Sequence, residues 1–127
     1  PGTLGAMHVS GIGKALLAWF SRDRVRQIVA DQGLTRFTPR SLSEEGALMA
    51  DLAATRQRGF AVDDQERAEG MRCVAAPIFN AYGEPVAGLS ISGPAFRVDL
   101  AETPRIGALV RAAADEVTNA TGGRVPD

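Results

Sequence analysis

The stretch of sequence that decides the fold is residues 71–93, MRCVAAPIFNAYGEPVAGLSISG. It holds two apolar runs, 71–79 and 85–93, separated by the segment Asn80-Ala81-Tyr82-Gly83. Apolar runs of this length on either side of Asn and Gly are typical of a β-hairpin. We therefore predict two antiparallel strands at the centre of the fold.

The register of this hairpin groups polar side chains on one face. A four-residue loop pairs Phe79 with Glu84 and Cys73 with Ser90. Ser92 is two residues from Ser90, so both hydroxyls point to the face of Cys73. A hydroxyl buried without a hydrogen bond costs about 1–3 kcal/mol, so each one needs a partner. Either neighbouring backbone or water satisfies the two serines, or they contact a ligand.

Working outward from the hairpin toward the N-terminus, a short strand over 60–62 leads into the charged loop 63–70. Before it, helical spacing and capping residues predict three helices. The first helix follows the N-cap Ser10 and runs through 14–20. The second runs from the N-cap Ser21 to Asp31 and ends at Gly33. The third runs from Ser43 to Gly59.

A last helix follows the hairpin. Thr103 is its predicted N-cap and Pro104 its first residue, a position where the missing N–H of proline costs nothing. Gly122-Gly123 ends it. Its apolar stripe is predicted to be Ile106, Leu109, Val110, Ala113 and Val117.

Helices before and after an antiparallel pair indicate the α+β class, an antiparallel sheet packed with helices. The length of 127 residues suits one domain. Two or three strands make a marginal sheet by themselves, and the chain opens on Pro1 without a starting methionine. We therefore expect that an N-terminal part of the domain is absent.

Composition excludes several classes of protein. The 14 basic and 15 acidic residues leave a net charge of −1, whereas nucleic-acid-binding surfaces carry a basic excess. A single cysteine excludes an internal disulfide and suits a reducing compartment. No run approaches the roughly 18 apolar residues of a membrane span. We expect a cytoplasmic protein with no membrane partner.

Signals of an enzyme are incomplete. Gly11-Ile12-Gly13-Lys14 superficially suggests a phosphate loop, but His8 and Ala15 stand where that loop needs Gly and Ser or Thr. Gly88-Leu89-Ser90-Ile91-Ser92 lacks the second Gly of a nucleophile elbow. No cluster of His, Cys and carboxylates has the spacing of a metal site. The sequence predicts no catalytic residue, metal or cofactor, and it leaves a Cys73–His8 pair as the enzymatic alternative.

Two further features suit a ligand. The backbone amides of Gly11 and Ile12 lie at the start of a helix, where unpaired donors and the helix dipole favour an anion. The same glycine also suits a helix start that needs a positive φ. Asp63 and Asp64 follow a strand and can bind a ligand hydroxyl, although acidic loops are usually only solvated.

Taken together, these segments resemble the IclR family of bacterial transcription regulators. The matching stretches, in order, are 8–18, 48–60, 63–66, 70–79 and 90–94, which include His8-Val-Ser-Gly-Ile-Gly-Lys and Ser90-Ile-Ser-Gly-Pro94. The resemblance implies a GAF-like effector-binding domain over 1–127. It also implies that DNA is bound only through a winged helix-turn-helix that this chain does not contain.

The family resemblance further implies a pocket for a small organic acid such as glyoxylate or pyruvate. It places six residues on the effector and Met71 in the pocket wall; the six are Gly11, Ile12, Asp63, Cys73, Ser90 and Ser92. Ile12 stands where Ala is expected, and its larger side chain either narrows the pocket or points away.

The resemblance implies a homo-oligomer, a dimer or tetramer, that is not an enzyme. Two alternatives remain: a pure oligomerisation module with a vestigial pocket, and an enzyme that acts on a small oxo acid through Cys73.

Overall fold

A computed structural model describes residues 7–126, which form one antiparallel sheet and a set of helices. The strands are β1 (Ala61–Asp64), β2 (Met71–Phe79) and β3 (Pro85–Pro94), in the order β1-β2-β3. The helices are α1 (Gly11–Leu17), α2 (Arg22–Gln32), α3 (Glu45–Arg58) and α4 (Thr103–Ala120), with a 3-10 turn, η2 (Leu100–Glu102), before α4. The predicted α+β class is confirmed. Among residues 7–126, no helix is both long enough and apolar enough to cross a bilayer.

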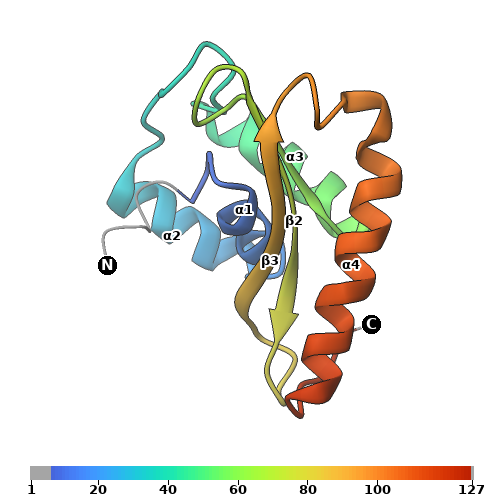
Figure 1. Cartoon of the computed structure of the whole chain (residues 1–127). Helices are drawn as coiled ribbons and strands as arrows, with labels where there is room; N and C mark the ends of the chain where they lie inside the picture. The colour runs from blue at the N-terminus through green and yellow to red at the C-terminus, as the bar shows by residue number, and fades with distance from the viewer. Residues whose placement is uncertain (1–6, 127) are drawn as a thin grey trace.

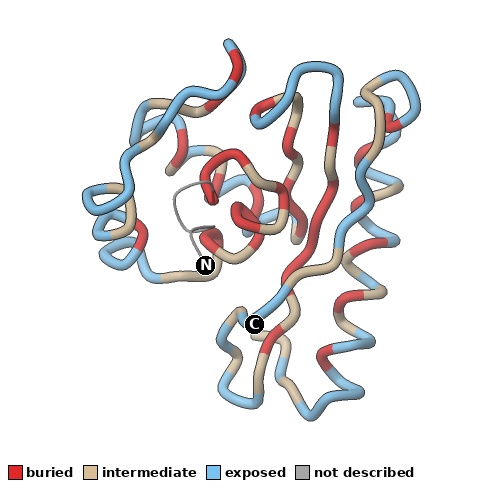
Figure 2. The backbone as a smooth tube through the Cα atoms, turned by 60° about the vertical axis from the view of Figure 1, so that its left-hand side comes forward, coloured by how far each residue is buried: buried red, intermediate tan, exposed pale blue. Residues whose placement is uncertain are grey.

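Helices cover both faces of the sheet. Figure 1 shows α4 along one side of the strands and α1 with α2 on the other. Phe60, Val74 and Val110 belong to the core beneath α4. Ala15 and Ala75 belong to the core beneath α1. Buried backbone therefore runs through the middle of the molecule, along α1 and the central strand (Figure 2).

The N-caps and C-terminal glycines of the first helices follow the sequence prediction. The hydroxyl of Ser10 accepts a hydrogen bond from the Gly13 amide at 3.1 Å, and the hydroxyl of Ser21 accepts one from the Arg24 amide at 3.1 Å. Gly59 ends α3 with φ of 95°, a left-handed conformation that glycine adopts without strain. These local signals place the start of α1, the start of α2 and the end of α3, whereas α1 ends at Leu17, three residues before the predicted end.

Two predicted helix starts are wrong. Helix α3 begins at Glu45, with Glu44 as its N-cap, because the Ser43 hydroxyl instead accepts a hydrogen bond from Arg36 at 2.8 Å. Thr103 is the first residue of α4 rather than its N-cap, because η2 leads directly into the helix. The Thr103 hydroxyl donates back to the Leu100 carbonyl at 2.8 Å.

The buried face of α4 is also rotated from the predicted stripe. Val110 is buried as predicted, but the side chains of Leu109 and Val117 are exposed. Small and polar residues take their place. A Cβ at Gly107 would lie 2.4 Å from the Phe60 ring, and the Thr118 hydroxyl accepts a hydrogen bond from the Phe79 amide at 3.0 Å. The helix therefore lies close to the sheet through its smallest side chains.

The hairpin forms where predicted, but its register is shifted by two residues. Cys73 lies opposite Ser92 rather than Ser90, and Ser90 lies opposite Ala75. Phe79 lies opposite Pro85 rather than Glu84, so the connection has Glu84 as a fifth residue, whose carbonyl accepts a hydrogen bond from the Asn80 amide at 2.9 Å. A bulge next to Ile78 and Phe79 adds the second residue of the shift. Beyond the bulge, from Ala87 onward, the shift is even, so Ser90 and Ser92 stay on their predicted face.

Strand β1 is longer than predicted. Its pairing with β2 extends to Asp64, so Asp63 and Asp64 belong to the sheet and not to the following loop. Asp63 lies opposite Cys73 in this pairing. The extra length of β1 therefore places Asp63 on the sheet beside Cys73, within the candidate site.

Candidate functional site

Three of the predicted site residues form one row across the sheet. Asp63 on β1 lies opposite Cys73 on β2, which in turn lies opposite Ser92 on β3. Ser90 belongs to the adjacent row, opposite Ala75. Because side chains two residues apart share a face, all four predicted residues point to the side of the sheet that α1 covers.

The first turn of α1 lies directly on this row. A Cβ at Gly11 would lie 2.7 Å from the sulfur of Cys73 and 3.5 Å from the Cβ of Ala75. Gly11 is not among the glycines with positive φ, so the need for a special backbone conformation is not the reason for glycine here. The reason is the close contact between the helix backbone and Cys73.

Ile12 continues this contact onto β3. A Cβ at Gly88 would lie 2.7 Å from a methyl carbon of Ile12, so the Ile12 side chain packs over that glycine. Ser90, two residues after Gly88, is the next residue on the same face of β3. The large side chain of Ile12 therefore points toward the sheet and not away from it. As the first residues of a helix, Gly11 and Ile12 have N–H groups without an intrahelical acceptor.

Burial decreases across the row from β1 to β3. Asp63 is 8% exposed and Cys73 is partly buried, whereas Ser90 and Ser92 are exposed. Met71, on the same face two residues before Cys73, is 43% exposed. The row is therefore closed at β1 and open to solvent at β3.

The structure contains a hollow in another place. A space of about 670 Å³ lies between the end of α1 and helices α2 and α3. None of the seven predicted site residues lines it.

The Asp63 carboxylate is held by its own loop. Its Oδ1 accepts a hydrogen bond from the Glu66 amide at 2.8 Å. Burial raises the pKa of the Asp63 carboxyl above 3.8, although the bond from Glu66 and the charge of Lys14 act in the opposite direction. The backbone amide of Arg67 also acts on this carboxyl and lowers its pKa, as the Glu66 amide does.

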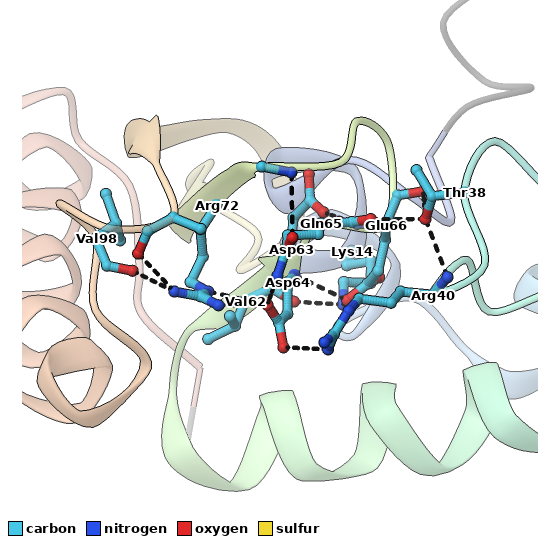
Figure 3. A network of polar contacts seen from close by, with 12 residues as sticks. Lys14, Thr38, Arg40, Val62, Asp63, Asp64, Gln65, Glu66, Arg72 and Val98 are labelled. Atoms are coloured by element: carbon cyan, nitrogen blue, oxygen red, sulfur yellow. Dashed lines mark hydrogen bonds and ion pairs between the residues drawn. The ribbon is translucent and has the colours of Figure 1, made fainter.

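A buried lysine that the sequence analysis did not single out lies behind this site (Figure 3). The Lys14 ammonium donates to Asp51 Oδ2 at 2.6 Å and lies 2.9 Å from Glu66 Oε1. It also donates to the Val62 carbonyl. Lys14 thus joins α1 to α3, to β1 and to the loop after β1.

The charges around Lys14 do not balance. The carboxylates of Asp51, Asp63 and Glu66 face a single ammonium, and burial raises the pKa of Glu66 despite that ion pair. The one signal in the sequence was a lone lysine within the apolar segment after Gly13. A lysine flanked by Gly-Ile-Gly and Ala-Leu-Leu has no polar face to occupy, so it must be buried with partners.

A second buried cation supports the opposite face of the sheet. The Arg72 guanidinium donates twice to Asp64 Oδ1, at 2.9 and 2.8 Å. It also donates to the carbonyls of Ala95 and Val98 at 2.9 and 2.6 Å. Burial acts to raise the pKa of Asp64, but the hydrogen bonds from Arg72 and Gln65 outweigh it and lower that pKa. Arg72 thus fixes the turn after β3 to β1.

The thiol–imidazole alternative finds no geometric support. His8 is buried, and its Nε2 lies 2.7 Å from the Thr35 carbonyl oxygen. Within residues 7–126 no hydrogen bond joins His8 to Cys73.

Comparisons with known proteins agree on one family. Residues 2–119 match the family model described as bacterial transcriptional regulator IclR C-terminal. The transcriptional repressor IclR of Escherichia coli is 46% identical over 117 residues, which are 92% of this chain and 43% of that protein. The regulator BhcR of Paracoccus denitrificans is 45% identical over 93% of this chain and 42% of its own length. The chain thus spans less than half of the curated relatives it matches.

Solved structures show the same relationship. The C-terminal domain of the E. coli regulator KdgR aligns with a TM-score of 0.83 and 36% identity, over 91% of this chain and 71% of that one. The inducer-binding domain of PobR from Acinetobacter, a double mutant in complex with 3-hydroxybenzoic acid, aligns with a TM-score of 0.82 and 28% identity, over 90% and 66% of the two chains.

Proposed function

The chain belongs to the IclR family of bacterial transcriptional regulators, and from that premise we propose that it senses a small organic acid and thereby modulates operator binding. The effector is a short 2-oxo acid of the glyoxylate or pyruvate type. DNA is contacted by a winged helix-turn-helix outside this chain. The chain itself binds the effector, assembles as a dimer or tetramer, and performs no catalysis.

The observation that carries this proposal is the row Asp63–Cys73–Ser92 beneath the first turn of α1. Amide donors of Gly11 and Ile12 approach it from the helix, and the two serine hydroxyls approach it from β3. Such an arrangement suits a carboxylate, because amides at a helix start and hydroxyls both donate hydrogen bonds to an anion.

The Asp63 carboxyl and two apolar side chains suit the other end of a 2-oxo acid. The Asp63 carboxyl accepts a hydrogen bond from a hydroxyl or hydrated carbonyl of the ligand, and Met71 and Ile12 supply apolar contacts. Binding alters DNA affinity only if the acid favours one arrangement of subunits over another.

Calorimetric titration tests the effector class and the site together. The panel is glyoxylate, pyruvate and larger organic acids, titrated into the parent chain and into Ser90→Ala and Asp63→Ala. Loss of one hydrogen bond to a charged ligand weakens binding by roughly 10- to 100-fold. Ser43→Ala and Asp31→Ala, on the connector before α3 and on α2, are the matched controls and leave the affinity unchanged.

The possible results separate the alternatives. Undiminished binding in both site variants means that the acid binds elsewhere. No binding of any acid, with normal assembly in sedimentation, leaves a pure oligomerisation module. Turnover of an oxo acid that disappears in Cys73→Ala establishes the enzyme instead.

A further inference from the structure

The hollow of about 670 Å³ between the end of α1, α2 and α3 has an apolar floor. Leu17, Val25 and Leu52 line it, and each is at most 4% exposed. Phe20 and Met49 add partly buried apolar surface around this floor. The volume lies within the range of about 300–1,000 Å³ that is usual for small-molecule sites.

Small residues of α3 keep the hollow open. Gly46, Ala50 and Ala53 line it at helical spacing, and a Cβ at Gly46 would meet no atom within 4 Å.

The rim of the hollow is cationic. Arg22 and Arg26 of α2 and Arg56 of α3 line it, against Glu45 as the only acidic lining residue. Within residues 7–126 these three arginines make no ion pair and donate no side-chain hydrogen bond. The rim therefore carries two more basic side chains than acidic ones.

Arg24 provides an internal contrast on the same helix. Its guanidinium stacks over the Phe20 ring at 4.0 Å from the centroid, and it does not line the hollow. The arginines that surround the floor are therefore distinguished from their neighbour by having no partner in the described chain.

We propose that this hollow is a second ligand site, which binds an amphipathic anion. The alkyl or aryl body lies on Leu17, Val25 and Leu52, and the carboxylate pairs with the arginines of the rim. An apolar floor alone would take a neutral ligand; the uncompensated positive charge selects the anion. No lining residue is shared with the row at Asp63, so this site does not depend on the function proposed above.

Octanoate is the probe, with 1-octanol as the uncharged control and acetate as the short one. Each is titrated into the whole chain, with affinity measured by calorimetry and location by amide shifts in heteronuclear NMR. Octanoate is expected to bind saturably, to shift the amides of Gly46, Ala50 and Ala53, and to bind equally well when glyoxylate is present. The two controls are expected to bind much more weakly.

Variants of the rim and floor test the assignment. Arg26→Gln and Arg56→Gln each weaken octanoate binding by roughly 2- to 5-fold, as expected for an exposed charge pair. Arg24→Gln changes it by less than about twofold by the same reasoning. Ala50→Leu fills the hollow and abolishes binding, while circular dichroism shows that the helices remain formed.

Four results would overturn the proposal. They are equal binding of octanol and octanoate, an equal loss in Arg24→Gln, amide shifts centred on Gly11 and Ser90, and no saturable binding below the micelle concentration. A change of oligomeric state in Arg26→Gln without any octanoate binding assigns the hollow to an interface between copies and equally excludes a ligand site.

Discussion

The ammonium of Lys14 lies within 3.0 Å of both carboxylate oxygens of Glu66, and both side chains are almost wholly buried. Lys14 belongs to α1 and Glu66 to the loop after β1, so this ion pair fixes the helix beside the predicted site to the loop that orients Asp63. Its partners and its burial lead to the first prediction.

Lys14→Met is expected to lower the free energy of unfolding by about 3–5 kcal/mol, because it leaves buried carboxylates without a counter-charge. Urea denaturation measures the loss. Arg105→Ala, which breaks an exposed pair with Glu102, is the control and costs less than about 1 kcal/mol. Equal losses in the two variants would mean that Lys14 contributes no more than a surface pair.

Asp63→Asn is expected to gain stability relative to the parent as pH rises. The folded pKa of Asp63 lies above the ordinary 3.8, so the folded state holds the proton longer than the unfolded chain does. The stabilisation from this group is therefore complete below 3.8 and lost as pH rises through the folded pKa. Denaturation at a series of pH values from about 4 to 7 measures this slope. A flat difference between variant and parent would contradict it.

Asp64→Asn, one residue along β1, is expected to show the opposite slope. The pKa of Asp64 is lowered, so its stabilisation is present above 3.8 and lost as pH falls through the folded pKa. The stability deficit of this variant should therefore be largest near neutral pH and shrink in acid. The two neighbouring carboxyls serve as controls for each other in the same titration.

Gly11→Ala is expected to destabilise the fold by about 1–3 kcal/mol, the usual cost of overpacking. The added Cβ would meet the Cys73 sulfur at 2.7 Å. Cys73→Ala in the same chain removes that sulfur and should recover much of the loss, which a double-mutant cycle measures. Gly46→Ala, where nothing lies within 4 Å, is the control and should gain stability.

Arg72→Lys is expected to loosen the turn after β3 selectively. A lysine ammonium cannot reproduce the forked contacts of Arg72 with Asp64 and two carbonyls. Hydrogen exchange should accelerate at Arg97 and Val98, whose amides close that turn onto Pro94, but not at Gly13 in α1. Uniform acceleration across the chain would indicate global destabilisation instead.

Local signals predicted much of the fold. Ser10, Ser21 and Gly59 act through short-range hydrogen bonds and backbone conformation, so the sequence is enough to place them. The buried face of α4 was not predictable in this way. It depends on Gly107 meeting Phe60 and on Thr118 meeting Phe79, contacts between segments that are far apart in the chain.

The candidate site, like the fold, was predictable from the sequence only in part. Alternation along the strands predicted that Cys73, Ser90 and Ser92 share a face, and the structure confirms that grouping. Whether they hold a ligand stays a prediction. The partners of Lys14 could not be foreseen, because Asp51 and Glu66 approach it from elements 37 and 52 residues away.

The bulge in the hairpin has a consequence for how this sequence can change over time. Ile78 lies opposite Ala87 and Phe79 opposite Pro85, so Val86 is a spare residue without a partner across the strands. Loss of one residue near the loop can be absorbed by straightening the bulge, with Ser90 and Ser92 still on the side of α1. Once the bulge has been straightened, deletion of one further residue would turn Leu89 and Ile91 toward α1 and place the two serines under α4. Homologous hairpins that keep the serines on the side of α1 should therefore lack the bulge when they are one residue shorter and retain it when they are two residues shorter.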